Sequence, residues 1–116
     1  MQYKSWIGRP ELEQEVLKSN KPSLVIFAAK WCGYCNRFLA IVDAYSPAQG
    51  APQVFVVDTD NGDGSLWDEY EVNVVPTIIL FQDGKQIFKK EGRFGAGLRE
   101  ADLEEALNKA VHEKPV

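Results

Sequence analysis

The sequence predicts an α/β fold with a mixed β-sheet, and three observations lead to this prediction. Short apolar runs of strand length alternate with segments of helical periodicity through the first part of the chain. The turn Asp83-Gly84 then joins two further strand-like runs as a hairpin, and an amphipathic segment ends the chain. Alternating strands and helices, followed by a hairpin and a final helix, are typical of an α/β fold with a mixed sheet.

The first half of the chain is predicted to form two helices and two strands. A helix opens at Pro10 and continues to about Asn20, where Lys21-Pro22 ends it. The continuous apolar run Leu24–Ala28 has the length of a strand that is buried on both faces. The second helix ends at Ser46-Pro47, and its apolar residues recur at helical spacing: Phe38, Leu39, Ile41, Val42 and Tyr45. The second short buried strand is Val54–Val57.

The second half begins with a polar segment, Asp58–Gly64, which we interpret as a turn between a strand and a short helix. That short helix is indicated by three apolar residues: Leu66, Trp67 and Tyr70. The hairpin consists of a third strand, Thr77–Phe81, and a fourth, Gln86–Lys90. The final helix runs from Leu98 to about His112, with one apolar face formed by Leu103, Ala106, Leu107 and Ala110.

Length and composition predict one globular domain over residues 1–116, because two shorter domains would each lack a core. Hydrophobic residues make up 45% of the chain and charged residues 26%, as in ordinary globular proteins. The formal charge of −4 argues against binding to nucleic acid. No apolar run approaches the roughly 20 residues that span a bilayer, so no membrane insertion is expected. We expect a monomer in the cytoplasm; the alternative is a periplasmic or other extracytoplasmic location after removal of a signal sequence.

The two cysteines stand three positions apart in the segment Trp31-Cys32-Gly33-Tyr34-Cys35. A zinc or iron–sulfur site needs more ligands than this pair supplies, and His112 is the only histidine, so we expect no metal and no bound cofactor. A site shared between two chains is left open. A disulfide that closes so short a loop adds little stability. Thiol–disulfide exchange is therefore the chemistry that the motif favours.

The position of the motif predicts different roles for the two thiols. Cys32 lies between the end of a strand and the start of a helix, where unpaired N–H groups and the helix dipole favour a thiolate. Cys35 lies one turn further in, so its thiol should be shielded and more reluctant to ionise. We therefore expect Cys32 to be the nucleophile that attacks a substrate disulfide and Cys35 to be the resolving thiol.

Three motifs in this order resemble those of the thioredoxin superfamily. The cysteine segment follows a buried strand, Val74-Val75-Pro76-Thr77 precedes another, and Asp83-Gly84-Lys85 lies in the hairpin, with Gly92 after its second strand. The resemblance implies the thioredoxin fold, with a mixed central sheet of four to five strands flanked by about four helices. It also implies that Pro76 is the family's cis-proline, packed opposite the cysteine pair. The adjacent Val75 backbone would then pair with an extended substrate segment.

The sequence departs from the family pattern at four places. The family's buried aspartate would fall at Ile26, and the lysine that often partners it would fall near Val54. Ala40 stands where thioredoxins have a helical proline, and the dipeptide between the cysteines is Gly33-Tyr34 rather than Gly-Pro. Gly-Tyr is similar to the dipeptide of certain bacterial disulfide isomerases. The chain therefore resembles a thioredoxin-like protein rather than a housekeeping thioredoxin.

Four apolar residues are expected to form a substrate-contact surface, namely Trp31, Tyr34, Val75 and Phe94; core packing is the alternative for the first two. The predicted function is dithiol–disulfide exchange on protein disulfides, most simply as a reductant. Electrons would come from a thioredoxin reductase or from a membrane thiol relay. One alternative is an oxidant or disulfide isomerase in an oxidising compartment, and another is a non-catalytic binding module with the same fold.

Overall fold

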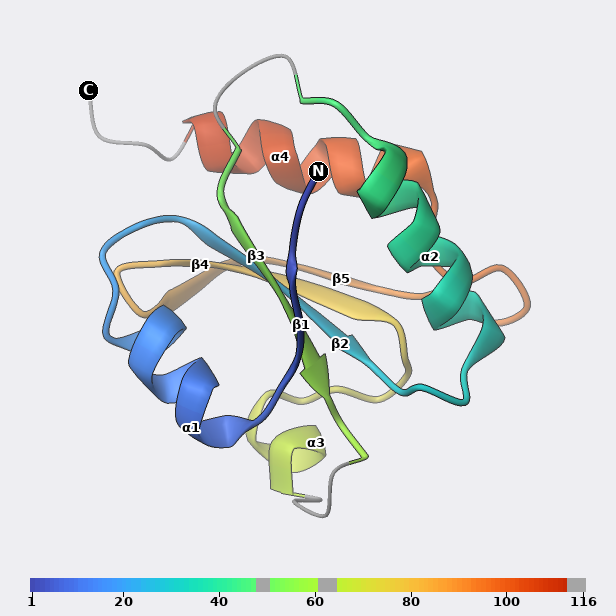
Figure 1. The fold of residues 1–116 in the computed structure, drawn as a ribbon, viewed down its shortest axis with the longest axis horizontal. Coiled ribbons are helices and arrows are strands. Elements are labelled where there is room, and N and C mark those ends of the chain that lie inside the picture. The colour runs from blue at the N-terminus through green and yellow to red at the C-terminus, as the bar shows by residue number, and fades with distance from the viewer. Residues whose placement is uncertain (48–50, 61–64, 113–116) are drawn as a thin grey trace.

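A five-stranded mixed sheet forms the centre of the protein (Figure 1). The computed structural model describes residues 1–47, 51–60 and 65–112. In the sheet the strands follow the order β1-β3-β2-β4-β5, which are Lys4–Ile7, Gln53–Asp58, Ser23–Ala28, Thr77–Gln82 and Lys85–Glu91. The strand β3 pairs in parallel with both β1 and β2, whereas β4 pairs antiparallel with both β2 and β5. The predicted mixed sheet of four to five strands is confirmed.

Helices cover both faces of this sheet (Figure 1). One face carries α1 (Arg9–Leu12), its π-helical continuation η1 (Glu13–Leu17) and α3 (Ser65–Glu69). The other face carries α2 (Gly33–Ala44) and α4 (Glu100–His112). Within the described residues, no helix has both the length and the apolar character needed to cross a bilayer.

The two faces follow from the alternation of side chains along each strand. In β2, the side chains of Leu24, Ile26 and Ala28 belong to the cluster formed with α2 and α4. Val25 and Phe27 belong to the cluster on the opposite face. Because both faces are covered, every residue of β2 is buried, as its continuous apolar run predicted.

The first strand, β1, was not predicted. It pairs in parallel with β3 at the edge of the sheet, with Lys4 opposite Phe55 and Ile7 opposite Val57. Of its four residues only Ile7 is buried. A short edge strand of this kind has little apolar alternation, so its place in the sheet depends on the partner strand rather than on its own pattern.

Two helix boundaries differ from those predicted. The first helix ends at Leu17 rather than near Asn20, where the β4–β5 turn packs against it. Gly84, at φ +75°, approaches so closely that a Cβ atom there would lie 2.5 Å from the Leu17 carbonyl oxygen. The last helix begins at Glu100 rather than at Leu98, which is fully buried just before it.

The end of β2, from which the cysteine segment leaves, is held by the segment that follows β3. The backbone N–H and the hydroxyl of Thr59 both donate hydrogen bonds to the Ala28 carbonyl oxygen, each at 3.0 Å. Trp67 in α3 donates its Nε1–H to the Thr59 carbonyl oxygen at 3.2 Å. Residues 61–64 of the interpreted turn lie outside the described residues.

Candidate active site

The cysteine pair lies at the start of α2, directly after β2. Cys32 is the residue that caps the helix, and its sulfur accepts a hydrogen bond from the Cys35 backbone N–H at 3.3 Å. This N–H is one of those that a helix leaves without an internal partner at its start. The Cys32 sulfur therefore lies where hydrogen bonding and the helix dipole both favour negative charge.

Cys32 is the more accessible of the two residues, although it is mostly covered. It is 7% exposed, whereas Cys35 is 0% exposed, and both are free thiols. The Cys32 thiol donates a long hydrogen bond to the Val75 carbonyl oxygen, with 3.7 Å between sulfur and oxygen. Gly33 borders open space, since a Cβ atom there would meet no atom within 4 Å.

The environment of Cys35 strongly disfavours its thiolate. Burial, together with the hydrogen bond to the Cys32 side chain, raises the pKa of the Cys35 thiol to about 12. The thiol is thus protonated throughout the neutral range. Cys35 is the more deeply buried of the two cysteines, as the position of the motif predicted.

The segment before β4 faces the cysteine pair. The Val75–Pro76 peptide bond is cis, as the resemblance implied, and Pro76 is buried. The Thr77 hydroxyl donates to the Val74 carbonyl oxygen at 2.6 Å, and the Gly92 N–H donates to the Pro76 carbonyl oxygen at 2.9 Å. A Cβ atom at Gly92 would lie 2.8 Å from that same oxygen, so the close approach of this residue to Pro76 requires glycine.

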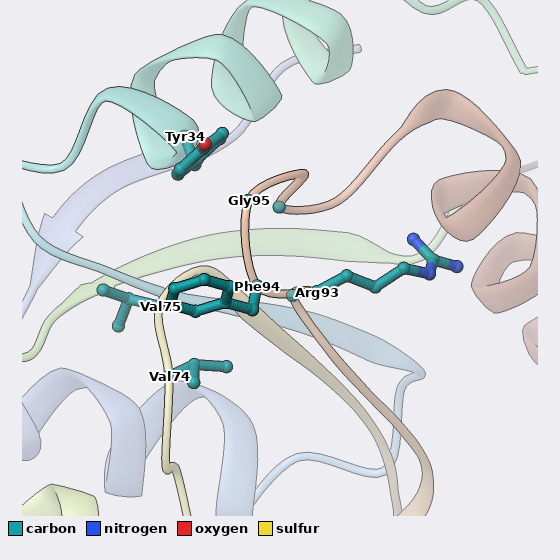
Figure 2. Close-up of a pocket in the computed structure, with 8 residues that line it drawn as sticks. Tyr34, Val74, Val75, Arg93, Phe94 and Gly95 are labelled. Atoms are coloured by element: carbon teal, nitrogen blue, oxygen red, sulfur yellow. The ribbon is translucent and has the colours of Figure 1, made fainter.

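An apolar pocket of about 380 Å³ lies between α2 and the loop that follows β5 (Figure 2). Its lining consists of Tyr34, Val74, Val75, Gly92, Arg93, Phe94, Gly95 and Gly97. In Figure 2, Tyr34 lies across the pocket from the ring of Phe94, which points toward Val75, while the Arg93 side chain extends the opposite way. Phe94 is fully exposed and Tyr34 is 40% exposed, so apolar surface is open to solvent beside the cysteine pair.

Three of the predicted substrate-contact residues are brought together in this pocket: Tyr34, Val75 and Phe94. Trp31 is not part of the lining. It is 69% exposed, and its Nε1–H donates to a carboxylate oxygen of Asp60 at 3.2 Å. Neither Trp31 nor Tyr34 is a core residue, so the core alternative is wrong for both.

The sequence analysis missed several residues of the pocket, among them Val74, Arg93, Gly95 and Gly97. One signal was present in the sequence. Residues 92–97 contain three glycines around a large aromatic residue, directly after a strand. Such a segment indicates a loop whose backbone packs closely against a neighbour and whose aromatic side chain is displayed to solvent.

Ile26 is fully buried in the same cluster as Cys35. The β3 residue opposite it is Val56, two positions from Val54, and both valines belong to this cluster. In the described part of the chain, the groups that act on the pKa of Cys35 are the backbone and Cys32, and none is a carboxylate. Ile26, where the resemblance places the family's buried aspartate, is therefore an apolar member of the cluster that contains Cys35.

No group of three or more histidine, cysteine, aspartate or glutamate side chains gathers at a metal-binding distance within the described ranges. Among these residues, none joins the cysteine pair to complete a tetrahedral site.

The family model described as Thioredoxin matches residues 7–109. Thioredoxin Y, chloroplastic, from Oryza sativa subsp. japonica is 36% identical over 94 residues, which are 80% of this chain and 55% of that protein. The chain thus spans about half the length of that relative. A thioredoxin from Porphyra purpurea is 30% identical over 108 residues, covering 92% of this chain and 96% of that protein.

The solved structure of a variant thioredoxin from Halobacterium salinarum superposes on this chain with a TM-score of 0.77 and 28% sequence identity. The superposition covers 98% of this chain and 95% of that chain. The resemblance in fold that the sequence motifs implied is therefore confirmed.

Proposed function

The chain belongs to the thioredoxin family, and on that basis we propose that it reduces disulfide bonds in other proteins through Cys32 and Cys35. Family membership and the closely placed cysteine pair support a thiol–disulfide oxidoreductase. The observation that carries the proposal is the asymmetry of the pair. The Cys32 sulfur caps α2 and lies beside the Val75 carbonyl, while Cys35 is buried with its pKa at about 12.

The proposed reaction has two steps. The Cys32 thiolate attacks one sulfur of the substrate disulfide, forming a mixed disulfide and releasing the second substrate sulfur as a thiolate, which takes up a proton. Cys35 then loses its proton and attacks the Cys32 sulfur, which releases the other substrate sulfur. The products are a dithiol substrate and a Cys32–Cys35 disulfide, so two electrons pass from the protein to the substrate. The Cys35 N–H stabilises the Cys32 thiolate before the first attack.

We place the substrate chain along Val75 and across the pocket. Pro76 has no N–H, so the backbone of Val75 is the group that would pair with an extended substrate segment. A large apolar side chain next to the substrate cysteine would enter the pocket between Tyr34 and Phe94. Trp31, which is 69% exposed, would cover the substrate on another side of the cysteine pair, and the backbone at Gly33 borders open space.

The oxidised protein must then be reduced again, and we propose a thioredoxin reductase or a membrane thiol relay as the electron donor. The proposed compartment is the cytoplasm, where thiols are kept reduced. In an oxidising compartment the same pair would act as an oxidant or an isomerase. A binding module with no redox role would not need one capped and one deeply buried thiol.

Two measurements test this proposal. Reduction of insulin in the presence of dithiothreitol should be accelerated by the wild-type protein and not by a Cys32→Ser/Cys35→Ser double variant. Equal rates of insulin reduction for both proteins would exclude the redox function and favour the binding module. The reduction potential of the cysteine pair, equilibrated with glutathione, should lie near the value of about −270 mV typical of thioredoxin. A potential near −120 mV, as in a strong periplasmic oxidant, would reverse the direction.

A further inference from the structure

The loop of residues 93–97 forms one wall of the pocket. The side chain of its aromatic residue, Phe94, is not fixed by packing. Phe94 is fully exposed. The loop closes on itself, because the Gly97 N–H donates to the Arg93 carbonyl oxygen at 2.8 Å and the Arg93 N–H donates to the Gly97 carbonyl oxygen at 3.1 Å. Gly95 adds no side chain at the tip. The position of the Phe94 ring therefore depends on what anchors the loop as a unit.

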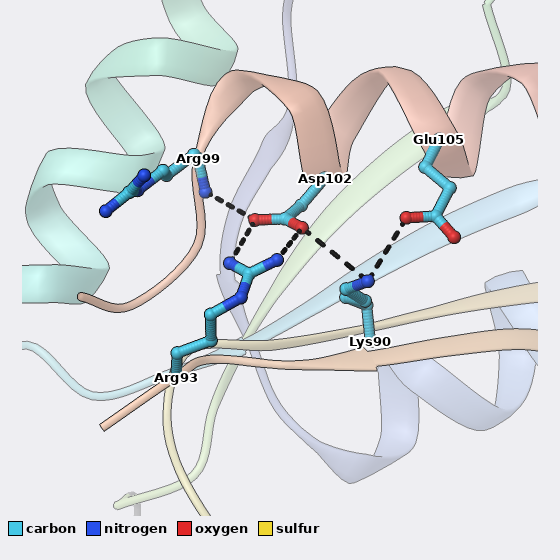
Figure 3. Close-up of polar contacts among 5 residues, drawn as sticks. All are labelled: Lys90, Arg93, Arg99, Asp102 and Glu105. Atoms are coloured by element: carbon cyan, nitrogen blue, oxygen red, sulfur yellow. Dashed lines mark hydrogen bonds and ion pairs between the residues drawn. The ribbon is translucent and has the colours of Figure 1, made fainter. Parts of the chain in front are cut away.

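One anchor is an ion pair with α4 (Figure 3). The guanidinium of Arg93 donates two hydrogen bonds to the Asp102 carboxylate, at 3.0 and 2.9 Å. The same carboxylate accepts the Arg99 backbone N–H at 2.8 Å, and Lys90 lies 3.9 Å from it. Asp102 is only 2% exposed, so its geometry is held by the surrounding protein. The Arg93 side chain is half exposed, but its bidentate pairing with a buried carboxylate fixes direction as well as distance.

A second anchor comes from α2. Arg37 donates a hydrogen bond to the Ala96 carbonyl oxygen, and its guanidinium lies 5.2 Å from the centre of the Tyr34 ring. Gly97, at φ +68°, packs directly on Tyr34, since a Cβ atom there would lie 2.9 Å from the Tyr34 Cβ. The α2 contacts hold the far end of the loop, while Arg93 holds the end that carries Phe94.

We propose that Asp102 is a positioning residue for substrate binding, which holds Phe94 as a wall of the pocket by anchoring the side chain of its neighbour Arg93. Asp102 itself is not part of the pocket lining. The substrates that depend on it are protein disulfides with a large apolar side chain beside the reacting cysteine. The inference rests on the proposed function, because it concerns the substrate class of the same site.

The test compares Asp102→Asn with Glu105→Gln in the full-length chain. Both variants remove one carboxylate from α4 within reach of Lys90, which lies 3.2 Å from Glu105. Of the two carboxylates, Asp102 is the one that accepts hydrogen bonds from Arg93. The probes are a disulfide-linked peptide with phenylalanine beside the cysteine, the same peptide with alanine, and hydroxyethyl disulfide, which is too small to reach the pocket.

In Asp102→Asn, KM for the phenylalanine peptide should rise roughly fivefold, with kcat unchanged; this corresponds to about 1 kcal/mol at 1.4 kcal/mol per tenfold change. The alanine peptide should show a smaller rise, and the rate with hydroxyethyl disulfide should stay within about twofold of wild type. Glu105→Gln should behave as wild type with all three probes.

Arg93→Met gives the second arm and removes the other partner of the ion pair. Its KM for the phenylalanine peptide should rise by a similar factor, and the double variant Arg93→Met/Asp102→Asn should show no further rise. Arg93→Lys should restore part of the affinity. Melting temperatures measured alongside establish that each variant is folded.

Three results would overturn the inference: an unchanged KM in Asp102→Asn, equal losses with the peptide and with hydroxyethyl disulfide, or additive effects in the double variant. If the wild type itself failed to reduce the peptide disulfides, the proposed function would fail and the inference with it. Wild-type turnover with unaffected variants would refute the inference alone.

Discussion

Resolution of the mixed disulfide should become about tenfold faster with each unit of pH between 6 and 9. The attacking species is the Cys35 thiolate, and burial, the largest cause, raises the pKa of this thiol to about 12. That value belongs to the reduced pair, where the Cys32 side chain also raises it. In the mixed disulfide, burial of Cys35 still disfavours its thiolate, so the protonated thiol remains the main species at neutral pH. Since no carboxylate in the described residues acts on Cys35, proton loss to solvent sets the rate.

The assay follows reaction of the reduced protein with dithiobis-nitrobenzoate in a stopped-flow instrument. Attack by Cys32 releases the first coloured thiolate, and attack by Cys35 on the resulting mixed disulfide releases the second. The rate constant of the second phase, plotted on a logarithmic scale against pH, should have a slope near 1. A second phase that is fast and constant between pH 6 and pH 8 would refute the reasoning, because another group would then be accepting the proton.

Substitution at Ile26 tests the same account from the other direction. Ile26→Asp places a carboxylate in the apolar cluster that contains Cys35, where it can act as a general base. Such assistance is typically worth a factor of roughly 100 or more, so the second phase at pH 7 should accelerate by about that amount. The fully buried isoleucine is lost, so the free energy of unfolding should fall by about 2–5 kcal/mol.

The matched control is Ile26→Asn, which has nearly the same shape as aspartate and no basic carboxylate. It should lose similar stability, measured by denaturant unfolding, without faster resolution. Equal acceleration in both variants would mean that loosened packing, rather than a base, limits the wild-type protein.

Three further predictions concern separate parts of the site. Cys35→Ser should accumulate mixed disulfides that non-reducing electrophoresis detects, and Cys32→Ser should capture nothing; the opposite pattern would reverse the assignment of roles. Gly97→Ala combines φ +68° with a Cβ atom 2.9 Å from that of Tyr34, so it should cost at least about 1 kcal/mol and lower the melting temperature by several degrees. An unchanged melting curve would show that the loop adapts freely. The pKa of Asp102 lies below its usual range because the Arg93 guanidinium donates hydrogen bonds to the carboxylate. The ionised carboxylate therefore stabilises the folded protein fully above the unfolded-state pKa of about 3.9. This stabilisation is lost as pH falls through the lower folded-state pKa. Asp102→Asn should therefore flatten the dependence of the melting temperature on pH below about 4, and an unchanged dependence would argue against the ion pair.

The sequence by itself determined the features that have a local pattern. Short apolar runs predicted β2 and β3 because strands covered on both faces are mostly apolar. The spacing of the two cysteines after such a run placed one at the start of a helix and the other one turn inside it. That spacing was sufficient to predict which of the two buried thiols is the less accessible.

Only the tertiary structure decided the features that join distant segments. Lys4–Ile7 becomes a strand because it pairs in parallel with β3 at the edge of the sheet, although its own residues have no strand pattern. Tyr34 and Phe94 are 60 positions apart and share a pocket because the sheet order brings the loop after β5 alongside α2. The pKa of Cys35 and the pairing of Asp102 with Arg93 likewise depend on what folds around each group. Periodicity reports which face of an element is covered, whereas the identity of the covering residue is set by chain topology and packing.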